Sequence, residues 1–442
     1  MNVLKVWERY WFPPASLFNL AVTRLIVVGF QVFWLLVSGH HTALMLRATT
    51  PDFLYQPLPV LRLLTLGTGL RPSASLLSLI FMLTIVAGVA ALIGFKTNYT
   101  LFGFAVGALF MQAFLYSFGE FHHPEAIMMI ALVALAFSPC GAVLSVDDLM
   151  RRQKQNAAES QFQPALVTQE QSRLALWPLR LVQWLFVLIY LSATISKMTT
   201  GAGHLDWMNG YTLQYYMLQD GLRWGSPLGV WLSQSTGLAV ILSCVSIIFE
   251  LTFFLVVLFP QLVWFYIPFG VLFHTSIYLI QRAPFFTFLA LYAVFIPWNR
   301  VAEHFQRSAP TRKPAIFFDG RCPLCIRSMT TLNYFDWGER LEYYALETHW
   351  SRLHMLHPEI TLAAGLQEMH ILLPDNTICT GYQAFREIWK RLPAFWPLVI
   401  LTYLPLASAI GPQVYRWIAD RRTRFPDECA TGVCMIHSPL NK

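Results

Sequence analysis

The chain has 442 residues, of which 56% are hydrophobic, 15% aromatic and only 12% charged. This composition lies outside the range of soluble globular proteins and indicates a membrane protein. The net charge of +7 does not indicate nucleic-acid binding, because Lys and Arg gather at the ends of apolar runs, where they set membrane orientation.

Apolar runs of about 20 residues, the length that crosses a bilayer, fill the chain as far as Trp298. We predict a polytopic α-helical bundle of about eight spans, near residues 15–38, 73–94, 99–118, 124–144, 177–197, 237–259, 261–281 and 284–298. Prolines are the only features that divide the last three runs, so totals of seven and nine stay open. The segment 199–235 is too polar to span and predicts an interfacial helix or a re-entrant cap.

Basic residues in the short loops predict the orientation of this bundle. With the N-terminus inside, eleven Lys and Arg fall on the inner side and five on the outer side. Because cytoplasmic loops carry the excess of basic residues, we expect a multi-pass protein of the bacterial inner membrane with both termini cytoplasmic. The polar stretch 151–171, rich in Gln, Asn and Ser, predicts a mobile cytoplasmic linker.

Several ionisable residues fall inside the predicted spans or at their edges, where charge is costly and marks functional sites. They are Arg24, His122, His123, Lys197, Glu250 and His274. Four of these residues also have a structural explanation that requires no functional site. Arg24 and Glu250 could pair with one another, His274 could be a hydrogen-bonded core histidine, and Lys197 could snorkel to the interface.

Residues 7–300 resemble the HTTM domain, the bacterial relatives of the membrane domain of the vitamin K-dependent γ-carboxylase. The resemblance rests on Arg24, the segments 120–125, 144–148 and 206–210, Lys197 and His274. It implies that Lys197 is a base toward a quinone-like ligand, a role that requires the neutral amine favoured by an apolar pocket. The chain has no counterpart of the large lumenal region of the carboxylase, so we expect an apolar ligand rather than glutamate carboxylation.

After the bundle (1–300) and a linker (301–312), residues 313–442 have the pattern of a small α/β domain. Strands are predicted near 315–318, 341–345, 369–373 and 377–380, and helices near 323–335 and 381–392. The order β-α-β and then β-β-α predicts a thioredoxin-like fold. The apolar run 397–410 is short for a span and predicts a helix that covers the sheet.

The first of these strands ends in Asp319-Gly320, a turn signal, and Cys322-Pro323-Leu324-Cys325 follows. Pro323 suits the first helical turn, which places the Cys322 thiol where free backbone N–H groups and the helix dipole stabilise a thiolate. This pattern predicts thiol–disulfide exchange, with Cys322 as the partly exposed nucleophile and Cys325 as the resolving thiol. Half of a zinc site is the alternative, because Cys-x-x-Cys is also a metal-ligand spacing.

Two further features of this region have more than one interpretation. Asp319 either caps the turn or accepts the proton of Cys325. The tail cysteines Cys429 and Cys434 could form a disulfide, relay electrons, complete a four-thiolate zinc site or be incidental.

The segments 319–325, 380–385 and 414–422 resemble the DCC family of thiol–disulfide oxidoreductase-like proteins over about residues 313–430. The resemblance implies catalytic roles for Cys322, Cys325 and Asp319. The strand at Met369 departs from the wider thioredoxin group, because no proline directly precedes it.

The sequence therefore predicts a membrane-bound thiol–disulfide oxidoreductase, coupled to a quinone-like ligand of the bundle and acting on a thiol or disulfide partner. One alternative is a non-catalytic membrane scaffold whose cysteine pair binds metal or senses redox state. Another is a carboxylase-like or maturation enzyme that works through Lys197 and His274.

Overall fold

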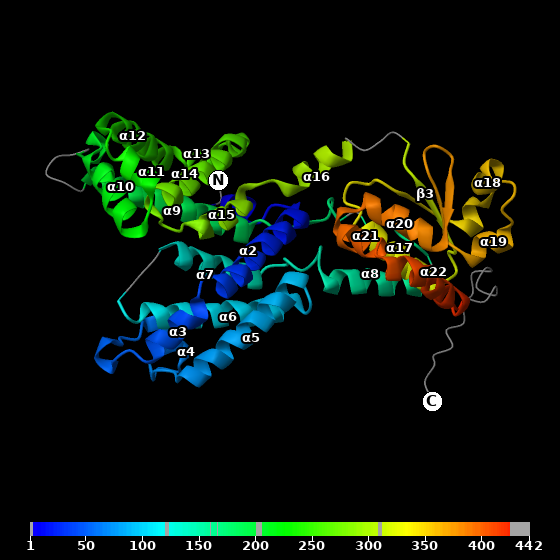
Figure 1. Cartoon of the computed structure of the whole chain (residues 1–442), viewed down its shortest axis with the longest axis horizontal. Helices are drawn as coiled ribbons and strands as arrows, with labels where there is room; N and C mark the ends of the chain where they lie inside the picture. Colours follow the sequence, from blue (N-terminus) through cyan, green and yellow to red (C-terminus); the bar gives the residue numbers. More distant parts are fainter. Residues whose placement is uncertain are drawn as a thin grey trace. The chain divides into compact units, whose positions relative to one another are not determined.

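The computed structural model describes residues 3–119, 123–159, 161–165, 167–199, 206–307 and 312–424, without the side chains of 123 and 124 (Figure 1). Its contacts divide the chain into two units. The first comprises Met1–Asp147 and Glu170–Trp298, and the second comprises Asp148–Gln169 and Asn299–Lys442.

The first unit contains the membrane helices. In the described part of the chain, six segments of this unit are long and apolar enough to cross a bilayer. They are α2 (Leu17–Val37), α5 (Ala74–Ile93), α6 (Thr97–Tyr116), α9 (Trp177–Thr199), α12 with α13 (Thr236–Thr252 and Leu255–Leu258), and η3 with α14 (Pro260–Leu262 and Val263–Gln281). The protein is therefore a multi-pass membrane protein, and the six corresponding predictions are confirmed.

The other two expected spans are shorter than predicted. Residues 124–144 contain only α7 (His123–Ala136), and residues 284–298 contain α15 (Phe286–Leu291) followed by η4 (Tyr292–Phe295). Pro139 follows α7 and Pro297 follows η4, and a proline cannot continue a helix without losing a backbone hydrogen bond.

Shorter elements complete the first unit. They are α1 (Val3–Trp11), α3 (His40–Ala48), η1 (Asp52–Leu54), α4 (Pro59–Leu64), η2 (Asp206–Asn209), α10 (Tyr211–Trp224), α11 (Pro227–Leu232) and the antiparallel pair β1 (Ala15–Ser16) with β2 (Gln171–Ser172). The segment expected to be interfacial forms α10 and α11, and α10 exposes Tyr211, Tyr215 and Trp224. Exposed aromatic residues of this kind suit a membrane surface.

The loop that contains residues 144–148 contacts two other parts of the first unit. Asp147 accepts hydrogen bonds from the backbone N–H groups of Lys96 (2.8 Å) and Thr97 (2.7 Å), so it caps the start of α6. The fully buried Arg24 donates to the carbonyl oxygen of Leu144 (2.5 Å). These contacts join α2, the α5–α6 turn and the end of the α7 region.

The second unit is built on a four-stranded mixed sheet of order β4-β3-β5-β6. Its strands are β3 (Ala315–Phe318), β4 (Glu342–Ala345), β5 (His370–Leu372) and β6 (Ile378–Thr380). β3 runs parallel to β4 and antiparallel to β5, and β5 runs antiparallel to β6. The predicted order of β-α-β followed by β-β-α is confirmed.

The alternation of β3 side chains builds two hydrophobic layers. Ile316 and Phe318 pack with α17 (Pro323–Tyr334) and α20 (Gly381–Arg391). Ala315 and Phe317 face the opposite side and pack with α18 (Leu346–Leu356) and α19 (Leu362–Gln367). α16 (Trp298–Arg307) precedes the sheet in the chain.

The expected mobile linker is wrong. Its first part forms α8 (Val146–Ala158), in which the buried Asn156 donates from Nδ2 to Thr330 Oγ1 of α17 (3.0 Å). The Tyr334 hydroxyl donates to Asp148 (3.0 Å), and the ring of Phe162 packs on that of Phe318. Residues 148–169 are thus part of the second unit, attached through polar groups that the sequence pattern presents as a solvated stretch.

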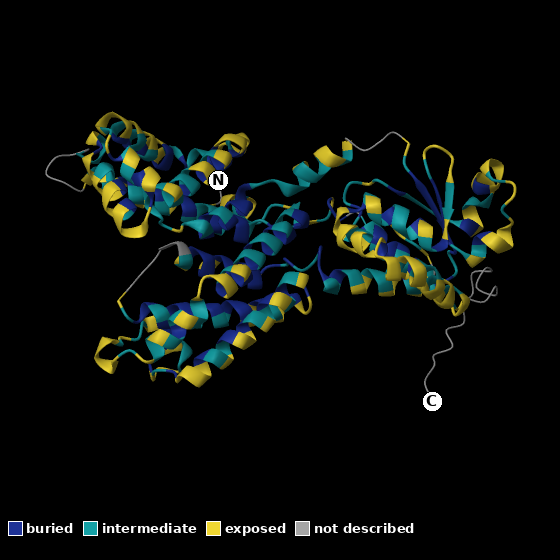
Figure 2. Cartoon of the chain, viewed as in Figure 1, coloured by how far each residue is buried: buried dark blue, intermediate teal, exposed yellow. Residues whose placement is uncertain are grey.

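The apolar run 397–410, expected to form one helix over the sheet, forms parts of two helices. After η5 (Pro393–Phe395), the apolar run forms α21 (Trp396–Thr402) and α22 (Pro405–Asp420), bent by 106° at the break before Pro405. Both helices pack on α20. In Figure 2, exposed residues follow much of α22, and the structure buries none of its residues.

Candidate active site at the cysteine pair

The two cysteines lie at the start of α17. Cys322 is the N-cap residue, and its sulfur accepts a hydrogen bond from the backbone N–H of Cys325 (3.2 Å). Pro323 occupies the first helical position, where a missing N–H group costs nothing. The predicted strand–turn–helix placement of the motif is confirmed.

The turn before the helix requires a small residue at Gly320. A side-chain carbon there would lie 2.8 Å from Cβ of Ala345 and 2.8 Å from a carboxylate oxygen of Glu347. That oxygen also accepts the backbone N–H of Gly320 (3.0 Å). The close approach holds the cysteine loop against the end of β4.

The expected exposure of the two thiols is reversed. Cys322 has an exposed fraction of 0%, whereas Cys325 is only partly buried and lines a cavity. The N-cap conformation turns the Cys322 sulfur back toward the N–H of Cys325, and this accounts for part of its burial.

Neighbouring groups nevertheless favour the Cys322 thiolate. A hydrogen bond from the Cys325 thiol, the Cys325 backbone N–H and the charge of Arg422 lower the pKa of Cys322 to about 7, against the opposing effects of burial and Asp319. The same thiol hydrogen bond, together with burial, raises the pKa of Cys325 strongly. The pair therefore favours a state in which Cys325 keeps its proton and donates it toward a Cys322 thiolate.

Arg422 is a site residue to which the sequence analysis gave no role. It follows α22 and donates from Nη1 to the sulfur of Cys325 (3.2 Å). Its Nη2 donates to the carbonyl oxygens of Leu366 (3.2 Å) and Gln367, which fix the plane of the guanidinium. The segment 414–422, which resembles the DCC family, contains Arg422, but a contact across 97 residues cannot be read from spacing.

Asp319 makes the contacts of a residue that organises the turn. Its Oδ1 accepts from the backbone N–H of Arg321 (3.0 Å), and its Oδ2 pairs with Nε of Arg424 (2.7 Å). Its exposed fraction is 2%. Burial, with a further contribution from Asp319, raises the pKa of the neighbouring Glu347. Asp319 also lines the cavity beside Cys325, so the proton-acceptor interpretation stays a prediction.

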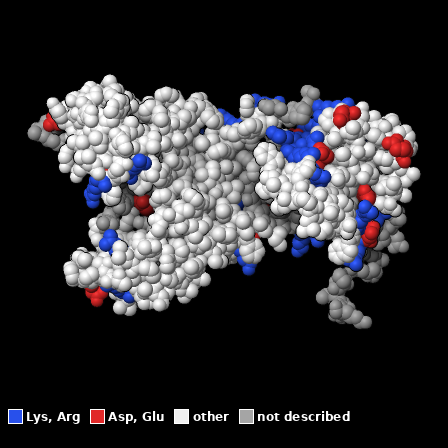
Figure 3. Space-filling view, viewed as in Figure 1, with Lys and Arg blue, Asp and Glu red and all other residues white. Residues whose placement is uncertain are grey.

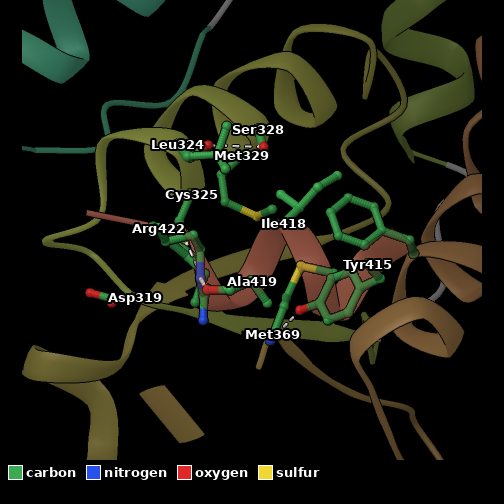
Figure 4. A pocket seen from close by; sticks show the side chains of 12 residues that line it. Asp319, Leu324, Cys325, Ser328, Met329, Met369, Tyr415, Ile418, Ala419 and Arg422 are labelled. Carbon is green, nitrogen blue, oxygen red and sulfur yellow. Dashed lines mark hydrogen bonds between the residues drawn. The ribbon is translucent and has the colours of Figure 1, made fainter. Parts of the chain in front are cut away.

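The cavity has a volume of about 220 Å³ and is mostly apolar. Its walls come from β3, α17, α20, α22 and residues that flank β3, β5 and α22: Phe318, Asp319, Leu324, Cys325, Ser328, Met329, Met369, Phe385, Tyr415, Ile418, Ala419 and Arg422. Figure 4 shows Arg422 beside Cys325, with Tyr415 and Met369 farther round the wall. The Met369 backbone N–H donates to the Tyr415 hydroxyl oxygen (3.1 Å), so this strand end faces a tyrosine.

The candidate residues of the membrane unit form two clusters. Lys197 Nζ pairs with Glu250 at 2.5 Å and lies 5.2 Å from the ring centroid of Trp207. The proposed Arg24–Glu250 pair is therefore wrong, since Glu250 pairs with Lys197.

The second cluster surrounds His274, which is buried as the structural explanation expected. His274 Nε2 and the Tyr190 hydroxyl form a hydrogen bond of 2.9 Å, and Tyr190 and Tyr292 share one of 2.6 Å. His122 lies outside the described residues, and His123 begins α7 without a described side chain.

The zinc alternative gains no support from this geometry. Within residues 3–119, 123–159, 161–165, 167–199, 206–307 and 312–424, no group of three or more His, Cys, Asp or Glu side chains could hold a metal ion. Cys429 and Cys434, which were candidates to complete such a site, lie outside the described residues.

Comparison with protein families gives two matches. Residues 14–299 match the model of the HTTM domain, and residues 316–427 match that of the DCC1-like thiol-disulfide oxidoreductase. Both agree with the resemblances seen in the sequence motifs. A search of curated proteins found no match, and a search of solved structures found none either.

Proposed function

Because the chain belongs to the HTTM domain family and carries a DCC1-like thiol-disulfide oxidoreductase domain, we propose that it is a membrane-tethered enzyme that exchanges its Cys322–Cys325 dithiol with a partner disulfide. The observation that supports this most strongly is the pair itself. One sulfur is stabilised as a thiolate at a helix N-terminus while the other holds a proton beside it.

The exchange proceeds in two balanced steps. The Cys322 thiolate attacks one sulfur of the partner disulfide, a mixed disulfide forms, and the second partner sulfur leaves and takes a proton. Cys325 then loses its proton and attacks the Cys322 sulfur, which releases the partner as a second thiol and leaves a Cys322–Cys325 disulfide. The partner gains two electrons and two protons, and the dithiol loses them.

Arg422 supports the second step. Its guanidinium donates to the Cys325 sulfur, so it stabilises the negative charge that develops there when the proton leaves. Asp319, in contact with the same cavity, orders the loop through Arg321 or accepts that proton.

We include in this proposal a lipid-soluble electron acceptor of the quinone class. Such a molecule would act when the exchange runs in reverse: a partner dithiol reduces the Cys322–Cys325 disulfide, and the quinone then takes two electrons and two protons from the dithiol as the disulfide forms again. Lys197 with Glu250, and His274 with Tyr190, supply polar groups among apolar helices where a ligand of this class could be held. The excess of basic residues in the predicted inner loops supports a cytoplasmic position for the second unit, which carries the cysteine pair.

The test is to trap the mixed disulfide in the purified full chain. Cys325→Ser should accumulate a partner-linked species that reductant removes, and Cys322→Ser should accumulate none. Cys379→Ser, which changes a partly buried cysteine on β6, is the matched control and should behave as the unchanged protein. Trapping only through Cys325 would overturn the assigned order of attack. A pair that reacts only after a chelator is added would overturn the exchange function.

A further inference from the structure

The hairpin of α21 and α22 presents an unusually apolar surface. Ile400 is 71% exposed and Leu406 is 72% exposed, and neither helix contributes large apolar side chains to the core of the second unit. Exposed apolar residues cover both helices: Trp396, Leu398, Ile400, Leu401, Tyr403, Leu404, Leu406, Ile410, Val414, Trp417 and Ile418. A contiguous surface of this kind marks an interaction site.

Most of the segment that forms this surface has no charged residue of its own, and basic residues flank that part in the sequence. Residues 393–415 contain no Asp, Glu, Lys or Arg. Lys390 and Arg391 precede that segment and Arg416 follows it. Without Arg422 and Arg424, which contact Cys325 and Asp319, five basic residues from 386 to 421 stand against two acidic ones. Figure 3 shows Lys and Arg beside the uncharged surface where α21 and α22 lie. A basic border around an apolar surface complements anionic lipid headgroups.

Three exposed aromatic residues belong to this surface, and two of them contact basic residues. Trp396, Tyr403 and Trp417 are exposed. The guanidinium of Arg386 lies 4.1 Å from the ring centroid of Tyr403, and that of Arg421 lies 4.1 Å from the ring centroid of Trp417. An aromatic ring with a cation at its face suits the headgroup region, where one end of the pair is apolar and the other hydrated.

The hairpin is too short and too bent to cross a membrane. At about 1.5 Å per residue, α21 with 7 residues and α22 with 16 residues extend about 10 Å and about 24 Å, less than the hydrocarbon core of about 30 Å. The 106° bend prevents the two from acting as one straight span. Its dimensions suit a segment that lies in the interface plane.

We propose that the α21–α22 hairpin is a docking surface for an anionic lipid bilayer. The chain itself brings the bilayer near, because the first unit holds it in a membrane through six long helices and thereby raises the effective concentration of lipid around the second unit. This inference is independent of the thiol chemistry.

A groove of about 650 Å³ adds a place for lipid on this surface. It lies among α20, α21 and α22, its lining is almost wholly apolar, and it shares Phe385, Tyr415 and Ile418 with the cavity at Cys325. Docking would therefore place lipid acyl chains against a groove that shares wall residues with the cavity at Cys325.

The test uses the full chain in nanodiscs of phosphatidylcholine with or without phosphatidylglycerol. A photoreactive benzoylphenylalanine replaces Ile400 on the hairpin or, as a control, Met355 on α18, which is 76% exposed in the same unit. After irradiation, mass spectrometry should find lipid adducts at 400 and at most a tenth as many at 355. The yield at 400 should rise several-fold with phosphatidylglycerol.

Two outcomes would overturn the proposal. Cross-links from 400 to protein, either the membrane unit or a second copy of the chain, would show that another surface covers the hairpin. Equal lipid yields at 400 and 355 would show that the hairpin does not dock. The charge requirement is tested by changing Lys390→Gln and Arg416→Gln together in the Ile400-labelled chain, which should remove the increase given by phosphatidylglycerol. An unchanged increase contradicts the role of the basic border.

Discussion

Cys322 shows how the surroundings of a buried sulfur can still favour its thiolate. Burial alone would raise the pKa of a thiol, but hydrogen bonds from the Cys325 thiol and backbone and the charge of Arg422 outweigh it. Under our proposal, the reacting thiol is therefore selected by ionisation rather than by exposure.

The first prediction concerns the pH dependence of Cys322. Since its pKa is lowered to about 7, the thiolate is the minor form at pH 6 and the major form at pH 8. The rate of alkylation by iodoacetamide, followed at Cys322 by mass spectrometry, should therefore rise about tenfold between these values and level off above pH 8.

The variant Arg422→Gln tests whether the charge of Arg422 contributes to the lowered pKa of Cys322. Removing the guanidinium should move the midpoint to higher pH and lower the rate at pH 7 by about threefold. Arg386→Gln removes a basic residue whose guanidinium contacts Tyr403, and it should leave the midpoint unchanged. A midpoint that stays in place in Arg422→Gln would contradict the electrostatic explanation.

The second prediction concerns Lys197 and Glu250. Glu250 is buried, so Lys197→Met should leave an uncompensated carboxylate and destabilise the membrane unit by about 3 kcal/mol. The double change Lys197→Met with Glu250→Gln should recover much of that loss. Thermal unfolding in detergent measures both, and a double variant no more stable than Lys197→Met alone would show that the pair does not act as a pair.

At the scale of elements, the third prediction concerns residues 148–169, which belong to the second unit together with the cysteine pair. The ring of Phe162 packs on Phe318 and Tyr343. Phe162→Ala should therefore destabilise the second unit by about 2 kcal/mol, below the cost for a fully buried Phe because this side chain is only partly buried.

Hydrogen exchange of β3 in the full chain measures this effect. Exchange should accelerate in Phe162→Ala and remain unchanged in Phe305→Ala, which removes an exposed Phe from α16. Equal exchange in both variants would show that 148–169 behaves as the linker that its composition suggests.

The strands, α17 and the long spans could be predicted because each has a local signature. β3 is a continuous apolar run that ends in Asp-Gly, and Pro323 marks the first turn of α17. The spans are recognised by length and hydropathy alone. The same signatures located Cys322, Cys325 and Asp319.

The features that could not be predicted depend on contacts distant in sequence. α8 attaches through Asp148 and Asn156, polar residues that composition assigns to solvent. Arg422 reaches Cys325 from the other end of the domain, and Glu250 pairs with Lys197 rather than Arg24 because the tertiary packing of the helices brings those two together. Nothing in a linear pattern distinguishes these partners from others of the same charge.

For the whole molecule, the fourth prediction is the side of the membrane on which the second unit lies. If the inner loops are cytoplasmic, a membrane-impermeant maleimide added to intact cells should leave Cys322 unlabelled and should label it after permeabilisation. Thr68→Cys, in an exposed position of the predicted outer segment, supplies the control that should react in intact cells. Labelling of Cys322 before permeabilisation would place the dithiol on the outer side, in an oxidising compartment.

The most direct test of the account is a redox titration of the purified full chain. In glutathione buffers of stepped potential, mass spectrometry of trapped samples should show Cys322 and Cys325 converting together between two thiols and one disulfide. The conversion should follow a two-electron curve, with about 30 mV for each tenfold change, while Cys379 and Cys140 remain thiols throughout. A Cys322–Cys325 pair that never forms its disulfide at any potential would contradict the account.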